Sequence, residues 1–143
     1  MKSNVSKYWL AVGPAQNWKI GLEQKVWGLP SKYFGIWQKV QPQDIVLFYS
    51  MVPIKGVIGY GIIVGKRTFG QPLWCEEVEI ESSLWPLRLY FKSVAHLHHG
   101  SWLEKNIRLQ NRIPVRRALQ QLPSDVAEEL LSRLQQSVLC RSS

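Results

Sequence analysis

The stretch DIVLFYSMVPIKGVIGYGIIVGK, residues 44–66, decides the fold of this 143-residue chain because it predicts two β-strands joined by a short turn. Its first part, residues 44–51, is almost wholly apolar, which is typical of a buried strand. After a turn at Pro53, residues 56–66 are rich in β-branched side chains and carry glycines that allow tight curvature. These strands predict a small curved β-sheet or a partly closed β-barrel at the centre of the molecule.

Further strands and helices are predicted on both sides of this centre. Alternating or β-branched runs predict strands over 7–12, 75–81 (CEEVEIE, an edge strand) and 87–94. Apolar spacing and start signals predict helices over 14–24, around 33–37, over 114–122 and from Ser124 to about Val138. The chain is therefore expected to be a single α+β domain spanning residues 1–143, with helices flanking the sheet.

The charge of the chain predicts a polyanionic partner. Eighteen Lys and Arg against ten Asp and Glu leave a net charge of +8, and residues 1–75 contain only Glu23 and Asp44 as acids. A basic surface of this kind is typical of proteins that bind nucleic acid. The chain has no apolar run long enough to span a bilayer, and the apolar centre near its start is too short for a signal peptide. We therefore expect a soluble, cytoplasmic protein with no membrane partner.

Known signatures of cofactor, metal and catalytic sites are not matched. The glycines at 59, 61 and 65 give GxGxxxG rather than GxGxxG, and Lys66 is followed by Arg where a phosphate-binding loop needs Ser or Thr. The histidines of HLHHG (96–100) predict an exposed loop, and the two cysteines, Cys75 and Cys140, have no ligand partner nearby. No nucleophile stands in a recognisable catalytic setting. We expect no metal, no cofactor and no enzymatic activity.

Tryptophan is the unusual feature, with seven residues at positions 9, 18, 27, 37, 74, 85 and 102. Trp9, Trp18 and Trp37 fall within predicted strands or helices and are expected to pack the core. The others of interest stand beside Gly or Pro or after a polar loop, in KVWGLPS (25–31), QPLWCE (71–76) and SLWPL (83–87). These settings place Trp27 in a turn and favour an aromatic cage for a ligand.

The chain resembles an EVE domain of the PUA-like superfamily, a relative of the YTH readers of N6-methyladenine. The stretches that carry the resemblance are YWLAVGPAQNW (8–18), KVWGLP (25–30), KVQPQDIVLFY (39–49), VIGYGIIVG (57–65), PLW (72–74) and LWPLRLYFKSV (84–94). The likeness runs from about Tyr8 to Leu134.

The resemblance implies a set of residues that bind a modified base. Trp27 matches one wall of the cage, and Asn17, ten positions earlier, matches a residue that contacts the base edge. Gly28 is expected to offer its backbone carbonyl to the exocyclic amine. Trp85 and Trp74 both match the second wall, and the choice between them stays open.

The stretch NIRLQNRIPVRR (106–117) resembles the basic region near the phosphates, which assigns backbone contacts to Arg108, Arg112, Arg116 and Arg117. The last three are also expected to gather around the start of a helix. Two departures stand out: the family's Gly-Asp turn is Gln43-Asp44 here, and its first-strand Lys-Ser is replaced by Ala11-Val12. The second removes base-edge contacts expected from that strand.

The function implied by the resemblance is recognition of one methylated base, foremost N6-methyladenine, flipped into an aromatic cage in DNA or RNA. The domain resembles the sensor modules of modification-dependent restriction systems, which implies fusion to or association with a nuclease or NTPase, while the isolated domain is expected to be monomeric. One alternative is an RNA-binding EVE protein that reads another base, such as 5-methylcytosine. A second is a module that binds a small ligand or a methylated peptide.

Overall fold

The computed structural model describes residues 6–68, 74, 78, 85–109, 114–115 and 117–142. In chain order its elements are β1 (Tyr8–Gly13), α1 (Ala15–Gln24), β2 (Val26–Leu29), η1 (Ser31–Tyr33), α2 (Phe34–Lys39), β3 (Ile45–Ser50), β4 (Gly56–Arg67), β5 (Leu87–His96), η2 (His99–Ser101), α4 (Trp102–Lys105), β6 (Leu119–Leu122) and α5 (Ser124–Ser142). The mixture of strands and helices confirms the predicted α+β class.

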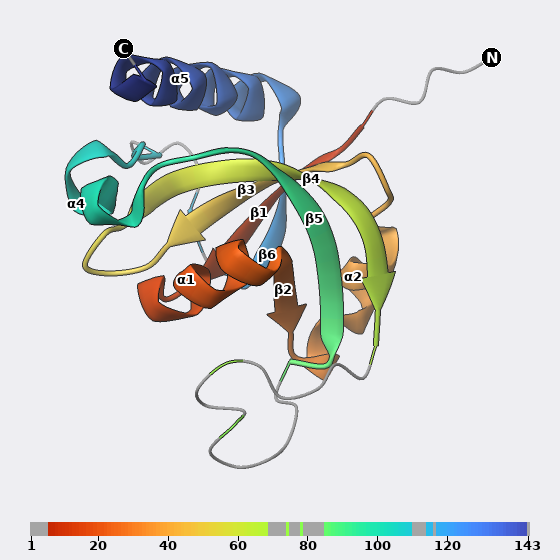
Figure 1. Ribbon diagram of the computed structural model, residues 1–143. Coiled ribbons are helices and arrows are strands. Elements are labelled where there is room, and N and C mark those ends of the chain that lie inside the picture. The colour runs from red at the N-terminus through yellow and green to blue at the C-terminus, as the bar shows by residue number, and fades with distance from the viewer. Residues whose placement is uncertain are drawn as a thin grey trace.

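The described strands form one curled sheet in the order β2-β5-β4-β3-β1-β6 (Figure 1). β1 pairs in parallel with β3, and the other pairs are antiparallel. The two edges of the sheet are therefore β2 and β6. We call the gap between these edges the seam, because the curl of the sheet brings both of them to the same side of the molecule.

The predicted central strands are confirmed as β3 and β4, and β4 curves as its glycines suggested. Its pairing with β5 shifts register at Tyr60/Gly61 and again at Ile63/Gly65. A Cβ at Gly61 would lie 2.6 Å from the Lys92 carbonyl oxygen, so only glycine allows β5 this close. Each register shift increases the local bend of the strand, which closes the sheet toward a half-barrel.

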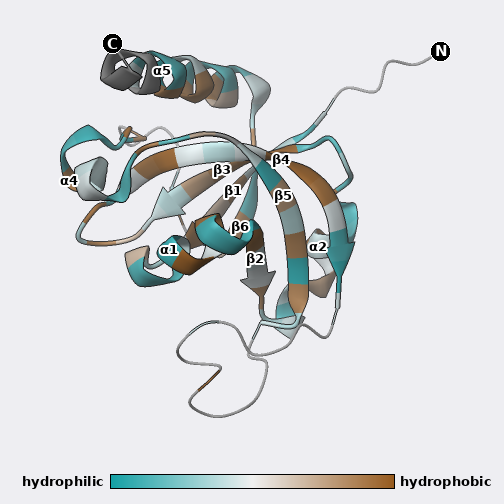
Figure 2. Ribbon diagram, in the orientation of Figure 1, coloured by the Kyte–Doolittle hydropathy of each residue, from teal (hydrophilic) through white to brown (hydrophobic). Residues whose placement is uncertain are grey.

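Successive residues of the strands point to opposite faces of the sheet, and their apolar side chains pack into two cores, one on each face. On the inner face, Trp9 and Ala11 of β1 join Trp18 of α1, and Trp37 of α2 belongs to the same cluster. On the outer face, Leu10 joins a second cluster with α5, which lies across the sheet in Figure 1. Bands of hydrophobic and hydrophilic residues alternate along α5 in Figure 2, as expected for a helix with one buried face. The predicted packing roles of Trp9, Trp18 and Trp37 are confirmed.

The turn before β3 is built around a buried carboxylate. Asp44 is 3% exposed and accepts hydrogen bonds from the Lys7 backbone N–H (3.0 Å), the Gln41 backbone N–H (2.9 Å) and the indole Nε1 of Trp9 (2.9 Å). Gln43 precedes it with φ of 77°, in the left-handed region that favours glycine. This geometry explains why the resembling family has glycine at the position of Gln43.

Three predictions about local structure were wrong. The stretch 114–122 ends in a strand, β6, because residues 119–122 pair with the free edge of β1. Trp27 lies in β2 rather than in a turn, where it pairs with Leu89. Within the predicted edge strand 75–81 the structure describes Val78, which donates its backbone N–H to the Trp74 carbonyl (2.9 Å) with the spacing of a helical turn. The rest of that stretch, Cys75 included, lies outside the described residues.

His96, His98 and His99 are exposed, as predicted, but His96 is the last residue of β5 rather than part of a loop. The rings of His98 and His99 stack with their centroids 5.2 Å apart. Within the described ranges, no three His, Cys, Asp or Glu residues gather closely enough to hold a metal ion. None of the helices in the described part of the chain is long and apolar enough to cross a membrane.

Candidate functional site

A cavity of about 100 Å³ opens at the seam, between the edge strand β2 and the segment that leads into β6. Its lining comes from several separate segments and consists of Val12, Gly13, Pro14, Asn17, Trp27, Gly28, Pro30, Trp74, Trp85 and Ala118. All five residues that the resemblance assigned to base binding are among them. The volume is below the roughly 300–1,000 Å³ of sites for drug-sized ligands, which suits one small planar group.

Trp27 is shared between this cavity and the inner core. Its indole stacks on that of Trp18 with ring centroids 3.7 Å apart and planes 9° from parallel, and the residue is 5% exposed. The expectation that Trp27 packs on ligand rather than on core was therefore wrong for one face of its ring. Its Nε1 is buried and finds no acceptor among the described residues.

Trp74 lines the cavity and is held on several sides. It is 1% exposed, its Nε1 donates to the Asn17 carbonyl (3.0 Å), and the guanidinium of Arg88 lies 4.9 Å from its ring centroid. Its ring is nearly perpendicular to both Trp27 (78°, centroids 5.8 Å apart) and Trp85 (88°, 5.5 Å). These contacts make Trp74 a packed residue with little free surface.

Trp85 differs from Trp74 because it is only half-buried. Its backbone carbonyl accepts a hydrogen bond from Nε of Arg88 (2.7 Å), which ties the start of β5 to the segment before it. Arg88 is itself 3% exposed, so this tie is internal. Of the two candidates for the second wall, Trp85 is the one with surface left for a ligand.

Gly28 presents backbone rather than side chain to the cavity. The hydrogen bond from Phe91 N–H to the Lys25 carbonyl (3.1 Å) makes that pair a hydrogen-bonded one, and such pairs alternate along an antiparallel ladder. Gly28, opposite Arg88, therefore falls on a pair whose N–H and C=O groups point away from β5 and toward the seam. A Cβ at Gly28 would lie 2.7 Å from the Trp85 Cβ and 3.0 Å from Cζ3 of Trp74, so a larger residue would displace the cage.

Asn17 lies in the first turns of α1 and is 5% exposed. Its backbone N–H donates to the Pro14 carbonyl (3.0 Å), and its carbonyl accepts from Trp74. The hydrogen bonds that the structure gives Asn17 thus come from its backbone. Its side-chain amide, which can donate and accept, lines the cavity.

The described lining of the cavity contains no ionisable side chain. Sequence reasoning missed Val12, Gly13, Pro14, Pro30 and Ala118, which complete the walls. One signal was present: the Gly13-Pro14 turn follows the first strand directly. A Cβ at Gly13 would overlap Cζ2 and Cη2 of Trp27, so glycine is needed there for the indole to fit.

The predicted phosphate contacts divide into three groups. Arg117 is exposed and directly precedes Ala118 of the cavity wall. Arg108 is exposed but follows Ile107, which bridges to Val57 in the outer core, so it does not line the cavity. Arg112 and Arg116 lie outside the described residues. The helix start that was to group these arginines is replaced by the approach to β6.

Comparison with known proteins identifies the fold. No protein-family model matches the chain. A UPF0310 protein of Pyrococcus abyssi is 36% identical over 59 residues, which are 41% of this chain and 42% of that protein. The chain thus matches less than half the length of this relative.

Two YTH domains show the fold across nearly the whole chain. The structure of an Mmi1 YTH domain in complex with RNA superimposes with a TM-score of 0.68 at 14% identity, covering 97% of this chain and 84% of that one. A CPSF4-YTH domain from Toxoplasma, solved without ligand, gives a TM-score of 0.59 at 12% identity, covering 95% and 90%. At these identities the likeness is one of fold. The chain has the PUA-like fold of the YTH domains.

Proposed function

We propose that this protein binds a nucleic acid and captures one methylated base, N6-methyladenine foremost, in the cavity at the seam. The observation that carries the proposal is the convergence of Trp27, Trp74, Trp85, Asn17 and Gly28 on one cavity, as the resemblance implied. The RNA bound to the Mmi1 YTH domain supports the class of partner, and the net charge of +8 supports a polyanion.

In this proposal the base enters beside Trp85, with Trp74 as the floor and Trp27 as the inner wall. Stacking on an indole contributes roughly 1–3 kcal/mol per base. The Asn17 amide orients the base through a ring nitrogen, and the outward-facing Gly28 carbonyl accepts from the exocyclic amine.

Methyl recognition requires more than contact area. Burying one methyl group contributes about 0.8 kcal/mol, or about fourfold in affinity. A stronger preference needs the cage to retain a void, or a polar group without its partner, when the methyl is missing. The small cavity favours this, because tryptophan rings packed on core or on each other cannot easily close in around a smaller base.

Binding without catalysis belongs to the same proposal. General acid and base catalysis needs a titratable group within hydrogen-bond reach of the reacting atoms. The described cavity lining offers an amide, indoles and backbone groups. This composition suits recognition of a neutral base and supports a reader rather than a base-modifying enzyme.

The experiment measures binding of matched single-stranded RNA and DNA oligonucleotides that carry adenine, N6-methyladenine, cytosine, 5-methylcytosine or 5-hydroxymethylcytosine at one position. We expect preference for one modified base, and we expect Trp85→Ala to weaken its binding by roughly 5- to 150-fold through lost stacking. Phe34→Ala is the matched control, because Phe34 is an aromatic residue that is 48% exposed and lies outside the cavity lining.

Equal affinity for all bases, or equal effects of the Trp85 and Phe34 variants, would contradict the proposal. A methylated peptide or small neutral ligand would instead bind with little dependence on salt, whereas nucleic-acid binding should weaken steeply as salt rises. The DNA and RNA arms decide the biological setting. Preference for DNA would favour a monomeric EVE sensor that works with a nuclease or NTPase of a modification-dependent restriction system, and preference for RNA would favour an RNA-reading EVE protein.

A further inference from the structure

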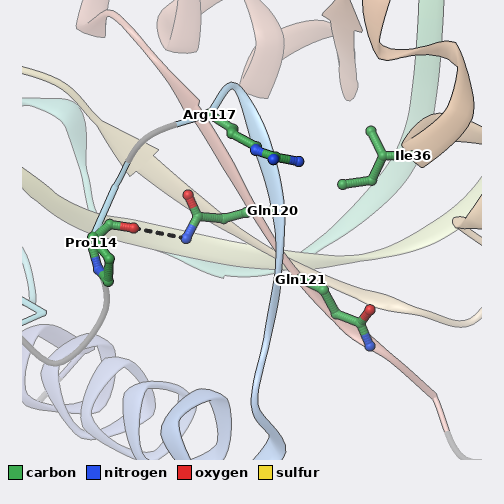
Figure 3. A pocket seen from close by; sticks show the side chains of 5 residues that line it. All are labelled: Ile36, Pro114, Arg117, Gln120 and Gln121. Carbon is green, nitrogen blue, oxygen red and sulfur yellow. Dashed lines mark hydrogen bonds between the residues drawn. The ribbon is translucent and has the colours of Figure 1, made fainter.

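A second hollow of about 370 Å³ lies at the seam, beside the aromatic cavity. It is lined by Ile36 of α2, by Pro114 and Arg117 on the approach to β6, and by Gln120 and Gln121 of β6 itself (Figure 3). Gln120 and Gln121 leave the strand in opposite directions, as neighbours in a strand do. The hollow therefore wraps around the free edge of β6.

The hollow and the aromatic cavity share a wall. Arg117 lines the hollow and Ala118, the next residue, lines the cavity, so their Cα atoms are about 3.8 Å apart. The Tyr33 hydroxyl accepts a hydrogen bond from the Ala118 N–H (3.0 Å) and joins this wall to η1. A ligand that extends out of the cavity across this wall reaches the hollow next.

The wall formed by α2 is held firmly in place. Nζ of Lys66 donates to the carbonyls of Trp37 and Gln38 at 3.1 Å each, and Nε1 of Trp37 donates to the Arg88 carbonyl (3.3 Å). Burial lowers the pKa of the Lys66 ammonium. Ile36 is thus presented by a helix that is tied to both β4 and β5, so this wall of the hollow is preformed.

The side chains around the hollow offer three kinds of contact. The Arg117 guanidinium is exposed and points across the hollow toward Ile36, and no described carboxylate lines the space (Figure 3). Gln121 is exposed, and its amide can donate and accept. The Gln120 amide donates to the Pro114 carbonyl (3.0 Å), which fixes the approach to β6. The Arg117 guanidinium can bind a phosphate, and the Gln121 amide can pair with the edge of a base. The apolar side chains of Ile36 and Pro114 can contact the flat face of a base.

We propose that this hollow is a second nucleotide subsite, which binds the nucleotide next to the captured base. The phosphate between the two nucleotides lies against Arg117, and the neighbouring base rests on Ile36 with its edge toward Gln121. The inference rests on the proposed function and extends it, because a contact to a base edge gives the protein a preference for the sequence beside the modification. The single-stranded nucleic acid then crosses the seam from the cavity beside β2 to the hollow beside β6.

The test combines a change in the bound oligonucleotide with a change in the protein. Short single-stranded oligonucleotides carry one central N6-methyladenine, and the base is removed from the 5′ neighbour, the 3′ neighbour or neither. We expect removal on one side to weaken binding by the native protein roughly 5- to 50-fold, as expected for loss of a base contact. In the Gln121→Ala variant, the loss of affinity caused by removing the neighbouring base should be at least threefold smaller. In the Gln136→Ala variant, which changes an exposed glutamine on α5, this loss should equal that of the native protein.

The proposal is overturned if removing either neighbouring base changes affinity less than twofold, or if the loss is the same in the Gln121 and Gln136 variants. Failure of the proposed function leaves a different signature, namely equal binding of strands with adenine and N6-methyladenine. The neighbour series is therefore repeated on unmodified strands. A Gln121-dependent loss there supports the subsite even if the modified-base preference is absent.

Discussion

The Asp44 turn and the aromatic cavity are both buried polar sites, but one is complete and the other is not. The Asp44 carboxylate accepts three N–H groups within 3.0 Å. Trp27 lines the cavity, and its buried Nε1 has no acceptor among the described residues. Other indole N–H groups of the molecule do find one, as shown by Trp9, Trp18, Trp37, Trp74 and Trp102.

Under the proposed function, this difference separates a structural site from a binding site. A buried donor that loses its water without gaining a partner costs about 1–3 kcal/mol. A fold that satisfies the Asp44 turn so fully tolerates that cost at Trp27, next to a cavity that Asn17 also lines. Under the proposed function, a ligand binds in the cavity that Trp27 lines, beside this unpaired donor. Substitutions at the Asp44 turn and at the cavity test this difference.

The largest effect is expected at the complete site. Asp44→Ala would strand three buried or partly buried N–H donors at once, and we expect it to lower the free energy of unfolding by about 3 kcal/mol or more. Chemical denaturation monitored by tryptophan fluorescence measures the change. Asp125→Ala, in the first turn of α5 and exposed, is the control and should cost under about 1 kcal/mol. A loss at Asp44 no larger than that at Asp125 would mean that the turn is not the structural site described.

An intermediate effect is expected from a matched pair of tryptophan substitutions. Trp9→Phe and Trp27→Phe both shrink a buried ring, but the first also removes a donor to Asp44 whereas the second removes a donor that lacks an acceptor. We therefore expect Trp9→Phe to destabilise the protein by about 1–3 kcal/mol more than Trp27→Phe. For binding of the modified base the order reverses, because Trp27 lines the cavity and Trp9 does not. The same order in both assays would remove the distinction between the two sites.

The strands that dominate the fold could be predicted from sequence because their signal is local. The runs at 44–51 and 56–66 are long, apolar and β-branched, and the structure has β3 and β4 there. The short strand β6 could not, because LQQL (119–122) has leucines three apart, which suits one helical turn as well as a strand. The free edge of β1 decides between them. The sequence did not predict β2 for a similar reason, because a strand of four residues that ends beside Pro30 is too short to show a periodic pattern.

The site was less accessible to sequence reasoning than the fold. Composition alone could single out the tryptophans beside Gly and Pro, while Asn17 and Gly28 entered only through the resemblance. The remaining wall residues come from segments far apart in the chain and share no local pattern. The stack of Trp27 on Trp18 depends on how β2 folds back along α1, which only the tertiary structure defines.

The smallest predicted effect concerns Gln43, which carries a backbone strain that the complete site tolerates. Its φ of 77° is unfavourable for a residue with a Cβ by roughly 1–2 kcal/mol, and Gln43→Gly removes this strain. Glycine also gains freedom in the unfolded chain, which offsets about 0.4–1 kcal/mol, so the net stabilisation should be at most about 1.6 kcal/mol. Gln41→Gly, two residues earlier and without a positive φ, has the entropic cost alone and should destabilise slightly. Thermal unfolding of the two variants side by side gives stability changes of opposite sign if the turn is strained as described.

Neither variant should change affinity for an oligonucleotide with a modified base, because Gln43 donates its N–H to the Ile63 carbonyl (2.8 Å) and lies outside both hollows. A loss of stability in Gln43→Gly equal to that in Gln41→Gly would show that this φ stores no strain.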